Sequence, residues 1–155
     1  MKKIILLNIA LAFFGLLSAQ NTIDFKMTFN HLTLLVKDPD RSVGFYKKVL
    51  KLNEINNRAK VTEMRWLSLG GNLELHLISI GNKNIIIDTA IHFALATQKF
   101  DAFIKRMKQM NVPFVDTDGK PNIFNIRADG VKQIYFQDPD GYWIEVNNIG
   151  EKKKH

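Results

Sequence analysis

Five titratable side chains lie inside otherwise apolar stretches of this chain. Two histidines stand near the starts of two such stretches, a glutamate and a histidine stand two residues apart in a third, and a glutamate stands late in the chain: His31, His92, Glu74, His76 and Glu145. An unpaired charge in such surroundings costs several kcal/mol, so these groups either point to solvent or have a partner. Imidazole and carboxylate ligands suit zinc, iron, manganese, nickel or cobalt, so a divalent metal would offset the penalty.

Each of these residues also has a simpler interpretation. A histidine near the start of a strand is more often at the surface or hydrogen-bonded in the core than bound to a metal, and no short zinc-ligand repeat is present. Glu145 could be an outward charge on an edge strand, and Glu74 could pair with a lysine. The argument for a metal therefore depends on whether distant segments bring these side chains together.

The first half of the chain predicts one strand, one helix and three further strands. The apolar, β-branched run 29–36 indicates a strand, and Asp38-Pro39 is typical of a helix start, with the helix running to about residue 50. Strands are expected at 52–59, 62–69 and 72–80, with a turn at Gly70-Gly71. Because strand side chains alternate, Glu74 and His76 share one face.

The second half repeats this order of signals. A strand is expected at 90–96, a helix at 99–110, a loop through Asp118-Gly119 and Pro121, and strands at 131–137 and 142–147. The tetrad at 138–141, Asp-Pro-Asp-Gly, has the composition of a tight turn. The halves resemble an internal duplication in which His31 corresponds to His92 and each half ends with an acid on a late strand.

Composition and the chain ends restrict the class of protein. The chain has 155 residues, 46% hydrophobic and 24% charged, which indicates a globular domain, and without cysteine it can form neither a disulfide nor a thiol nucleophile. Residues 1–20 read as a secretory signal cut near Ala19, which predicts an exported, periplasmic or secreted protein without a stable membrane anchor. The formal charge of +7 lies partly at the ends, including a basic tail at 150–155, so nucleic-acid binding is not expected.

Two segments resemble the glyoxalase, bleomycin-resistance and dioxygenase proteins of the vicinal oxygen chelate superfamily. Residues 31–46, HLTLLVKDPDRSVGFY, are similar to the opening of these proteins, and residues 133–147, QIYFQDPDGYWIEVN, to their final hairpin. The resemblance implies an α+β fold in which two βαβββ modules, about 28–80 and 89–149 of a domain at 28–149, form an open, cup-shaped mixed sheet around a divalent metal (Zn, Fe, Mn, Ni or Co).

The resemblance also implies a ligand set of His31, His92, Glu145 and a fourth residue, for which His76 is the closer likeness and Glu74 the alternative. Glu145 and Glu74 are the candidates for a catalytic base. The implied activity is that of a lyase, isomerase or dioxygenase acting on a small substrate with neighbouring oxygens, and the alternative is sequestration of a small molecule without catalysis. A homodimer is expected. The candidate substrate contacts are Trp66, Phe93, Phe124, Arg127 and Tyr135.

Overall fold

The structure is a computed structural model that describes residues 27–81, 87 and 91–149. The expected signal segment at 1–20 and the basic tail at 150–155 lie outside the described residues. No helix within the described part of the chain is long and apolar enough to cross a membrane.

The first sheet contains the strands of the N-terminal module. The chain runs through β1 (His31–Val36), α1 (Pro39–Val49), β2 (Asn53–Ile55), β3 (Met64–Gly70) and β4 (Leu73–Ser79). The strand order is β1-β4-β3-β2, with β1 parallel to β4 and the other pairs antiparallel. This mixed sheet follows from the crossover helix, because a helical connection returns the chain in the parallel direction and tight turns do not.

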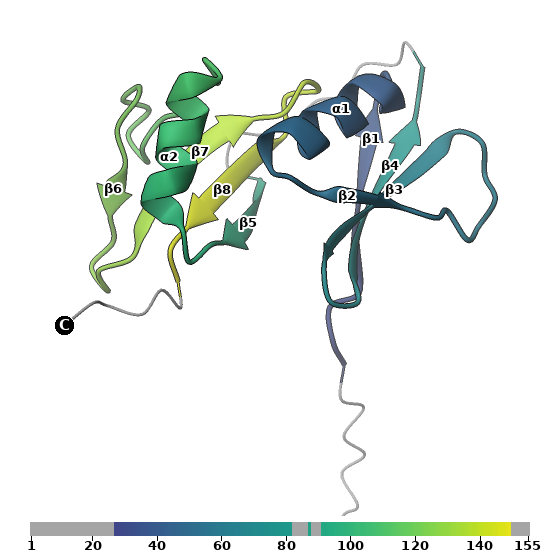
Figure 1. The fold of residues 1–155 in the computed structure, drawn as a ribbon, viewed down its shortest axis with the longest axis horizontal. Coiled ribbons are helices and arrows are strands. Elements are labelled where there is room, and N and C mark those ends of the chain that lie inside the picture. The colour runs from purple at the N-terminus through teal and green to yellow at the C-terminus, as the bar shows by residue number, and fades with distance from the viewer. Residues whose placement is uncertain (1–26, 82–86, 88–90, 150–155) are drawn as a thin grey trace, which may run out of the picture.

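The second sheet repeats this topology. Its elements are β5 (His92–Ala96), α2 (Phe100–Gln109), β6 (Asn125–Ile126), β7 (Lys132–Gln137) and β8 (Trp143–Asn147). The order is β5-β8-β7-β6, again with the first and last strands of the module parallel. The predicted α+β fold of two repeated modules is therefore confirmed, as two open four-stranded sheets (Figure 1).

Two local predictions differ from the structure. The strand expected at 52–59 ends at Ile55, because Asn57 turns the chain by accepting from the amide of Ala59 and donating to the carbonyl of Val61. The strand β6 falls inside the segment predicted as a loop, and it has only two residues.

Alternation along the strands gives each sheet a helix-side face and an opposite face. In β4, Leu75 and Leu77 are fully buried among core residues, and Glu74 and His76 point the other way. The helix-side faces and both helices form one core, whose largest fully buried members are Tyr46, Phe100, Phe114, Phe136, Leu67, Leu75 and Leu77. The titratable side chains thus lie on the faces turned away from this core.

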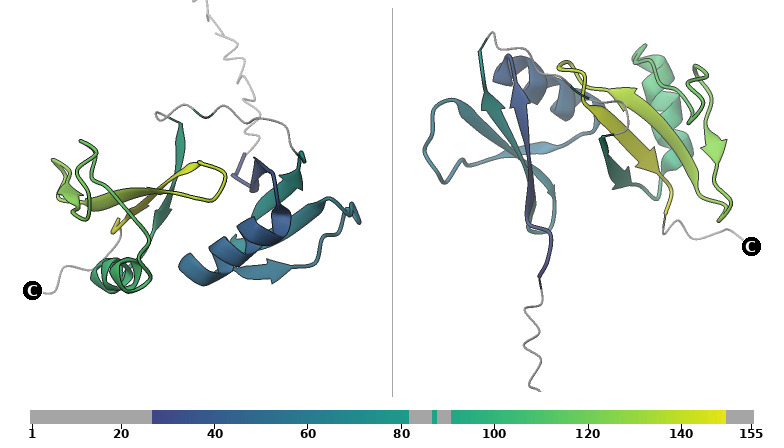
Figure 2. Two further views of the ribbon diagram at one scale, coloured as in Figure 1. Left: turned by 90° about the horizontal axis from the view of Figure 1, so that it is seen from above. Right: turned by 180° about the vertical axis from the view of Figure 1, so that it is seen from behind.

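The two modules are joined where the turn between β7 and β8 meets α1 (Figures 1 and 2). The Tyr46 hydroxyl donates to Oδ2 of the buried Asp138 at 2.6 Å, and the Ser42 hydroxyl donates to Oδ2 of Asp140 at 2.7 Å. The amide of Lys37 also donates to Asp140, at 2.9 Å. The predicted tight turn therefore also fixes one module against the other.

Candidate functional site

The sheet registers align the candidate residues of the two modules. In the parallel pairs, His31 lies opposite Glu74, two residues before His76, and His92 lies opposite Trp143, two residues before Glu145. In the antiparallel pairs, Trp66 lies opposite His76 and Tyr135 lies opposite Glu145. The position equivalent to Glu145 is therefore that of His76, and Glu74 corresponds to Trp143.

The first-sheet cluster consists of His31, Trp66, Glu74 and His76. The His76 ring is stacked between Trp66, at 4.0 Å between ring centres, and His31, at 4.4 Å. His76 Nε2 lies 2.9 Å from Glu74 Oε2, and Arg58 lies 2.6 Å from the other oxygen of Glu74. Hydrogen bonds from His76 first and from Arg58 second hold the pKa of Glu74 below its usual value, so Glu74 is a carboxylate.

The two ring nitrogens of His31 differ in their protonation. Its Nδ1 lies 2.7 Å from Oδ1 of Asn30, and since an amide oxygen only accepts, Nδ1 carries the proton. The lone pair of a neutral His31 is therefore on Nε2. Such a partner on the second ring nitrogen is the usual arrangement of metal-binding histidines.

The second-sheet cluster consists of His92, Tyr135, Glu145 and Asn147. Glu145 is 7% exposed at its side chain, and His92 Nε2 lies 3.4 Å from its Oε2. Tyr135 donates to the same oxygen at 2.8 Å, and Asn147 donates to Oε1 at 2.7 Å. Burial, followed by the hydrogen bond and the charge of Glu145, raises the pKa of Tyr135 to about 12, so this hydroxyl keeps its proton near neutral pH.

A cavity of about 460 Å³ opens beside this second cluster. It is lined by His92, Tyr135, Trp143 and the loop at 115–119. A larger, apolar groove of about 680 Å³ lies on the helix side between the modules, lined by residues that include Leu32, Phe93 and Phe103. The smaller cavity is the one that contains titratable candidates.

The two clusters do not merge within one chain. Among residues 27–81, 87 and 91–149, no group of three or more histidine, aspartate or glutamate side chains is arranged to hold a metal ion. Each sheet instead contributes a pair, His31 with His76 and His92 with Glu145. The predicted four-ligand site stays a prediction.

Two of the expected substrate contacts lie apart from both clusters. Phe93 alternates with His92, so it faces the apolar groove on the helix side. Phe124 packs edge to face on the core residue Phe100, at 5.8 Å between ring centres. A third, Arg127, pairs with Asp129 at 2.7 Å on the surface, and its charge opposes the rise in the pKa of Tyr135 in the second cluster. Trp66 and Tyr135, in contrast, contact candidate ligands directly.

Sequence reasoning missed one member of the clusters, Asn147, and two residues beside them, Trp143 and Arg58. Asn147 and Trp143 share the face of Glu145, and strand parity alone could have placed them there. Arg58 lies in the connection between β2 and β3, and no periodicity in the sequence pairs it with Glu74.

Comparisons with known proteins agree with this architecture. Glyoxylase I 4 of Arabidopsis thaliana is 26% identical over 128 residues, 78% of this chain and 70% of the relative. The metallothiol transferase FosB of Shouchella clausii is 30% identical over 131 residues, 81% of this chain and 84% of the relative. The fold is similar to that of a putative glyoxalase family protein from Bacillus anthracis, with a TM-score of 0.66 at 19% identity, over 81% of this chain and 98% of that one. A family model matches residues 28–146, so the chain belongs to the Glyoxalase/Bleomycin resistance protein/Dioxygenase superfamily.

Proposed function

We propose that this protein is a metal-dependent enzyme that acts on a small substrate with two neighbouring oxygens. The observation that carries the proposal is the repeated register. In both sheets a histidine begins the first strand, and a second candidate ligand lies on the parallel strand, two residues beyond the residue opposite that histidine. The four proposed ligands are His31, His76, His92 and Glu145.

The donor atoms of the second sheet fit a metal ion. Zinc lies about 2.0–2.2 Å from imidazole nitrogen and carboxylate oxygen, so two adjacent ligands are separated by roughly 3–3.5 Å. The separation of 3.4 Å between His92 Nε2 and Glu145 Oε2 falls in that range. On the first sheet, His31 offers a free Nε2, but its ring must leave the parallel stack on His76 before both rings can aim at one ion.

We further propose that two copies of the chain complete the site. Each sheet supplies two ligands, and the four do not converge among the described residues of a single chain. A twofold pairing that faces the first sheet of one copy with the second sheet of the other would join the two pairs, and it would do so twice per dimer. Relatives in this family bear names of enzymes, which supports a catalytic role.

In this proposal the bound metal would polarise the two substrate oxygens and stabilise negative charge on them. Glu145 would move the proton, since its buried carboxylate contacts His92 and Tyr135 of the cavity lining. The Tyr135 hydroxyl, which keeps its proton, would hold Oε2 of Glu145 in place, and Asn147 would fix Oε1. Trp143 and the loop at 115–119 would exclude water from the bound substrate.

Metal binding by complementary variants tests both the function and the shared site. We expect the wild-type protein to bind one divalent ion per chain, and His31→Ala and His92→Ala each to lose tight binding. After the two variants are mixed and re-associated at random, half of the dimers are mixed and one of their two sites is intact, so about one quarter of the binding returns. Wild type without stoichiometric zinc, iron, manganese, nickel or cobalt would refute the function. Tight wild-type binding without recovery would refute only the shared site.

A second candidate function is sequestration of a flat aromatic molecule. The cavity beside His92 is lined by the rings of Tyr135 and Trp143, which can stack on such a ligand without a metal. Ligand binding that survives His31→Ala and chelation would favour this function, and strict metal dependence would exclude it.

We also propose that the protein is exported, with a signal that lies within residues 1–20 and is cut after Ala19. The mass of the protein recovered from its producing cells tests this, because cleavage there leaves Gln20 as the first residue. A full-length chain retained inside the cell would contradict export.

A further inference from the structure

Arg58 contacts two of the three groups that hold His76, Glu74 and Trp66. Its Nη2 lies 2.6 Å from Oε1 of Glu74, and its guanidinium carbon lies 4.8 Å from the centre of the Trp66 ring. Glu74 in turn binds His76 Nε2 at 2.9 Å, and the Trp66 indole is stacked on the His76 ring with 8° between their planes. One arginine therefore contacts the hydrogen-bond partner and one of the two stacking partners of the same imidazole.

The protonation of His76 follows from these contacts. A carboxylate only accepts hydrogen bonds, so the hydrogen shared with Glu74 belongs to His76 Nε2. In the neutral ring, the free lone pair is then on Nδ1. The ion pair with Arg58 holds the Glu74 carboxylate in the position in which it accepts this hydrogen bond.

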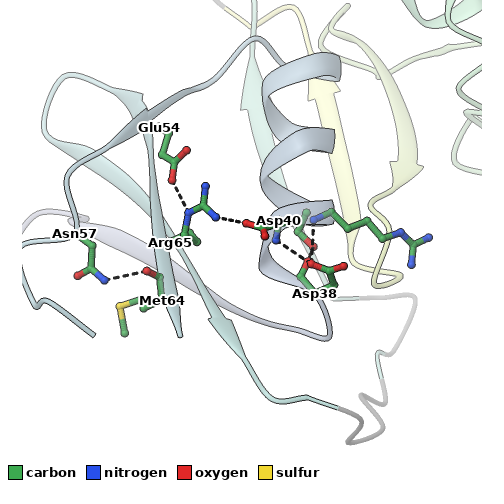
Figure 3. Close-up of polar contacts among 8 residues, drawn as sticks. Asp38, Asp40, Glu54, Asn57, Met64 and Arg65 are labelled. Carbon is green, nitrogen blue, oxygen red and sulfur yellow. Dashed lines mark hydrogen bonds and ion pairs between the residues drawn. The ribbon is translucent and has the colours of Figure 1, made fainter. Parts of the chain in front are cut away.

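The loop that carries Arg58 has a defined conformation. Asn57 donates from Nδ2 to the carbonyl oxygen of Val61 at 2.7 Å. It also donates to the carbonyl oxygen of Met64 at 2.9 Å (Figure 3). Arg65, next to Met64 in β3, is paired with Glu54 of β2 at 2.5 Å. The Arg58 side chain is 63% exposed and is nevertheless paired with the Glu74 carboxylate, whose side chain is only 12% exposed.

The second sheet holds its equivalent candidate ligand, Glu145, with neutral hydrogen-bond donors. The position equivalent to Glu74 is Trp143, and Glu145 is held by two neutral donors, Tyr135 and Asn147. A charged clamp on the candidate ligand is thus a feature of the first sheet only, within the part of the chain that is described.

We propose that Arg58 is a positioning residue that acts through Glu74 to fix the tautomer and the ring orientation of His76. The inference rests on the proposed function in taking His76 as a ligand. Glu74 then supports a ligand and is neither a ligand nor the base. Two observations favour this role over direct ligation by Glu74. His76 occupies the position in the first sheet that Glu145 occupies in the second, and the Arg58 cation already neutralises the Glu74 charge that a metal would require.

The metal-free protein provides the first test. Nitrogen NMR of ¹⁵N-histidine-labelled protein reports which ring nitrogen carries the proton, and we expect the wild-type His76 to be protonated at Nε2 alone when neutral. Arg58→Gln and Glu74→Gln should give a mixture of tautomers, and Arg58→Lys should restore much of the wild-type signal. Arg41→Gln is the matched control, because Arg41 is an exposed arginine of α1. A wild-type tautomer in both Gln variants would overturn the inference without any metal.

Metal affinity provides the second test. The direction in which Arg58→Gln changes the affinity shows whether Glu74 supports His76 or is itself a ligand. If Glu74 supports His76, Arg58→Gln weakens zinc binding by about 10- to 100-fold at unchanged stoichiometry, as loss of an outer partner does. The double variant with Glu74→Gln should then bind no more weakly than either single variant. If Glu74 is itself a ligand, Arg58→Gln strengthens binding by releasing its charge, and this outcome would overturn the inference. Wild type without zinc binding refutes the proposed function, while the tautomer result stands or falls separately.

Discussion

Removing the hydroxyl of Tyr46 should loosen the joint between the modules. Tyr46 is fully buried, and its hydroxyl donates to Asp138 at 2.6 Å. Asp138 is 6% exposed, and its other oxygen accepts from the amides of Asp140 and Tyr142. Tyr46→Phe leaves Asp138 with one unpaired buried oxygen, so we expect a loss of about 1.5–3 kcal/mol in the free energy of unfolding, the range for a hydrogen bond to a charged group.

Thermal unfolding followed by circular dichroism measures this loss. For a chain of this length, 1 kcal/mol corresponds to about 2–4 °C, so Tyr46→Phe should lower Tm by roughly 3–12 °C at pH 7. Tyr142→Phe is the matched control, because its hydroxyl accepts from the exposed amide of Leu35 at 3.2 Å, and it should change stability by less than about 1 kcal/mol.

The pH dependence tests the cause of the Tyr46→Phe effect. Burial raises the pKa of Asp138, and the hydrogen bond from Tyr46 opposes that rise. The gap between wild type and Tyr46→Phe should therefore narrow as the pH falls and Asp138 becomes protonated, because the bond is then no longer to a charge. A gap that is independent of pH, or no larger than that of Tyr142→Phe, would refute the reasoning.

Three further outcomes are expected. The pKa of Tyr135 is raised to about 12, so the stability that its protonated hydroxyl contributes is full below pH 10 and is lost as the pH rises from 10 to 12. In a pH series of melting curves, Tyr135→Phe should reduce the fall in stability over that range. The same fall in wild type and variant would contradict this expectation. Arg65 lowers the pKa of Glu54 through a hydrogen bond, so the stability that this pair contributes is present above the unfolded pKa of Glu54 and is lost in acid. Arg65→Met should lower the free energy of unfolding at neutral pH by about 1 kcal/mol or less. It should leave the stability at low pH unchanged. Leu77→Ala should cost about 2–5 kcal/mol in denaturant unfolding, because Leu77 is fully buried, and a loss below 1 kcal/mol would contradict its place in the core.

The sequence was sufficient for the two-module fold because its strongest signals are local. Asp38 caps α1 through hydrogen bonds to the amides of Asp40 and Arg41, as the Asp-Pro start predicted. Alternation along β4 likewise placed Glu74 and His76 on one face. The two-residue strand β6 was missed, because so short a segment has no measurable period and is held by its partner β7.

The candidate site was predictable only in part. Parity gives the face on which a side chain lies, but the register between strands decides its neighbours, and register chose His76 over Glu74 as the counterpart of Glu145. Phe93 was expected at the substrate, and its side chain faces the core side because His92 takes the opposite face. Whether the two sheets share a site depends on how whole modules pair, and no local pattern encodes that.

The turn at 138–141 makes the C-terminal module unsuitable for transfer as an isolated block. Both of its aspartates accept hydrogen bonds from the other module. Asp138 accepts from the Tyr46 hydroxyl, and Asp140 accepts from the Ser42 hydroxyl and the Lys37 amide. A chimaera that grafts residues 91–149 onto another N-terminal scaffold must therefore import a serine and a tyrosine four residues apart on the recipient helix. Otherwise Oδ2 of each of the two carboxylates loses its donor at the graft boundary. Recombination between relatives should succeed where those helix positions match and yield insoluble protein where they do not.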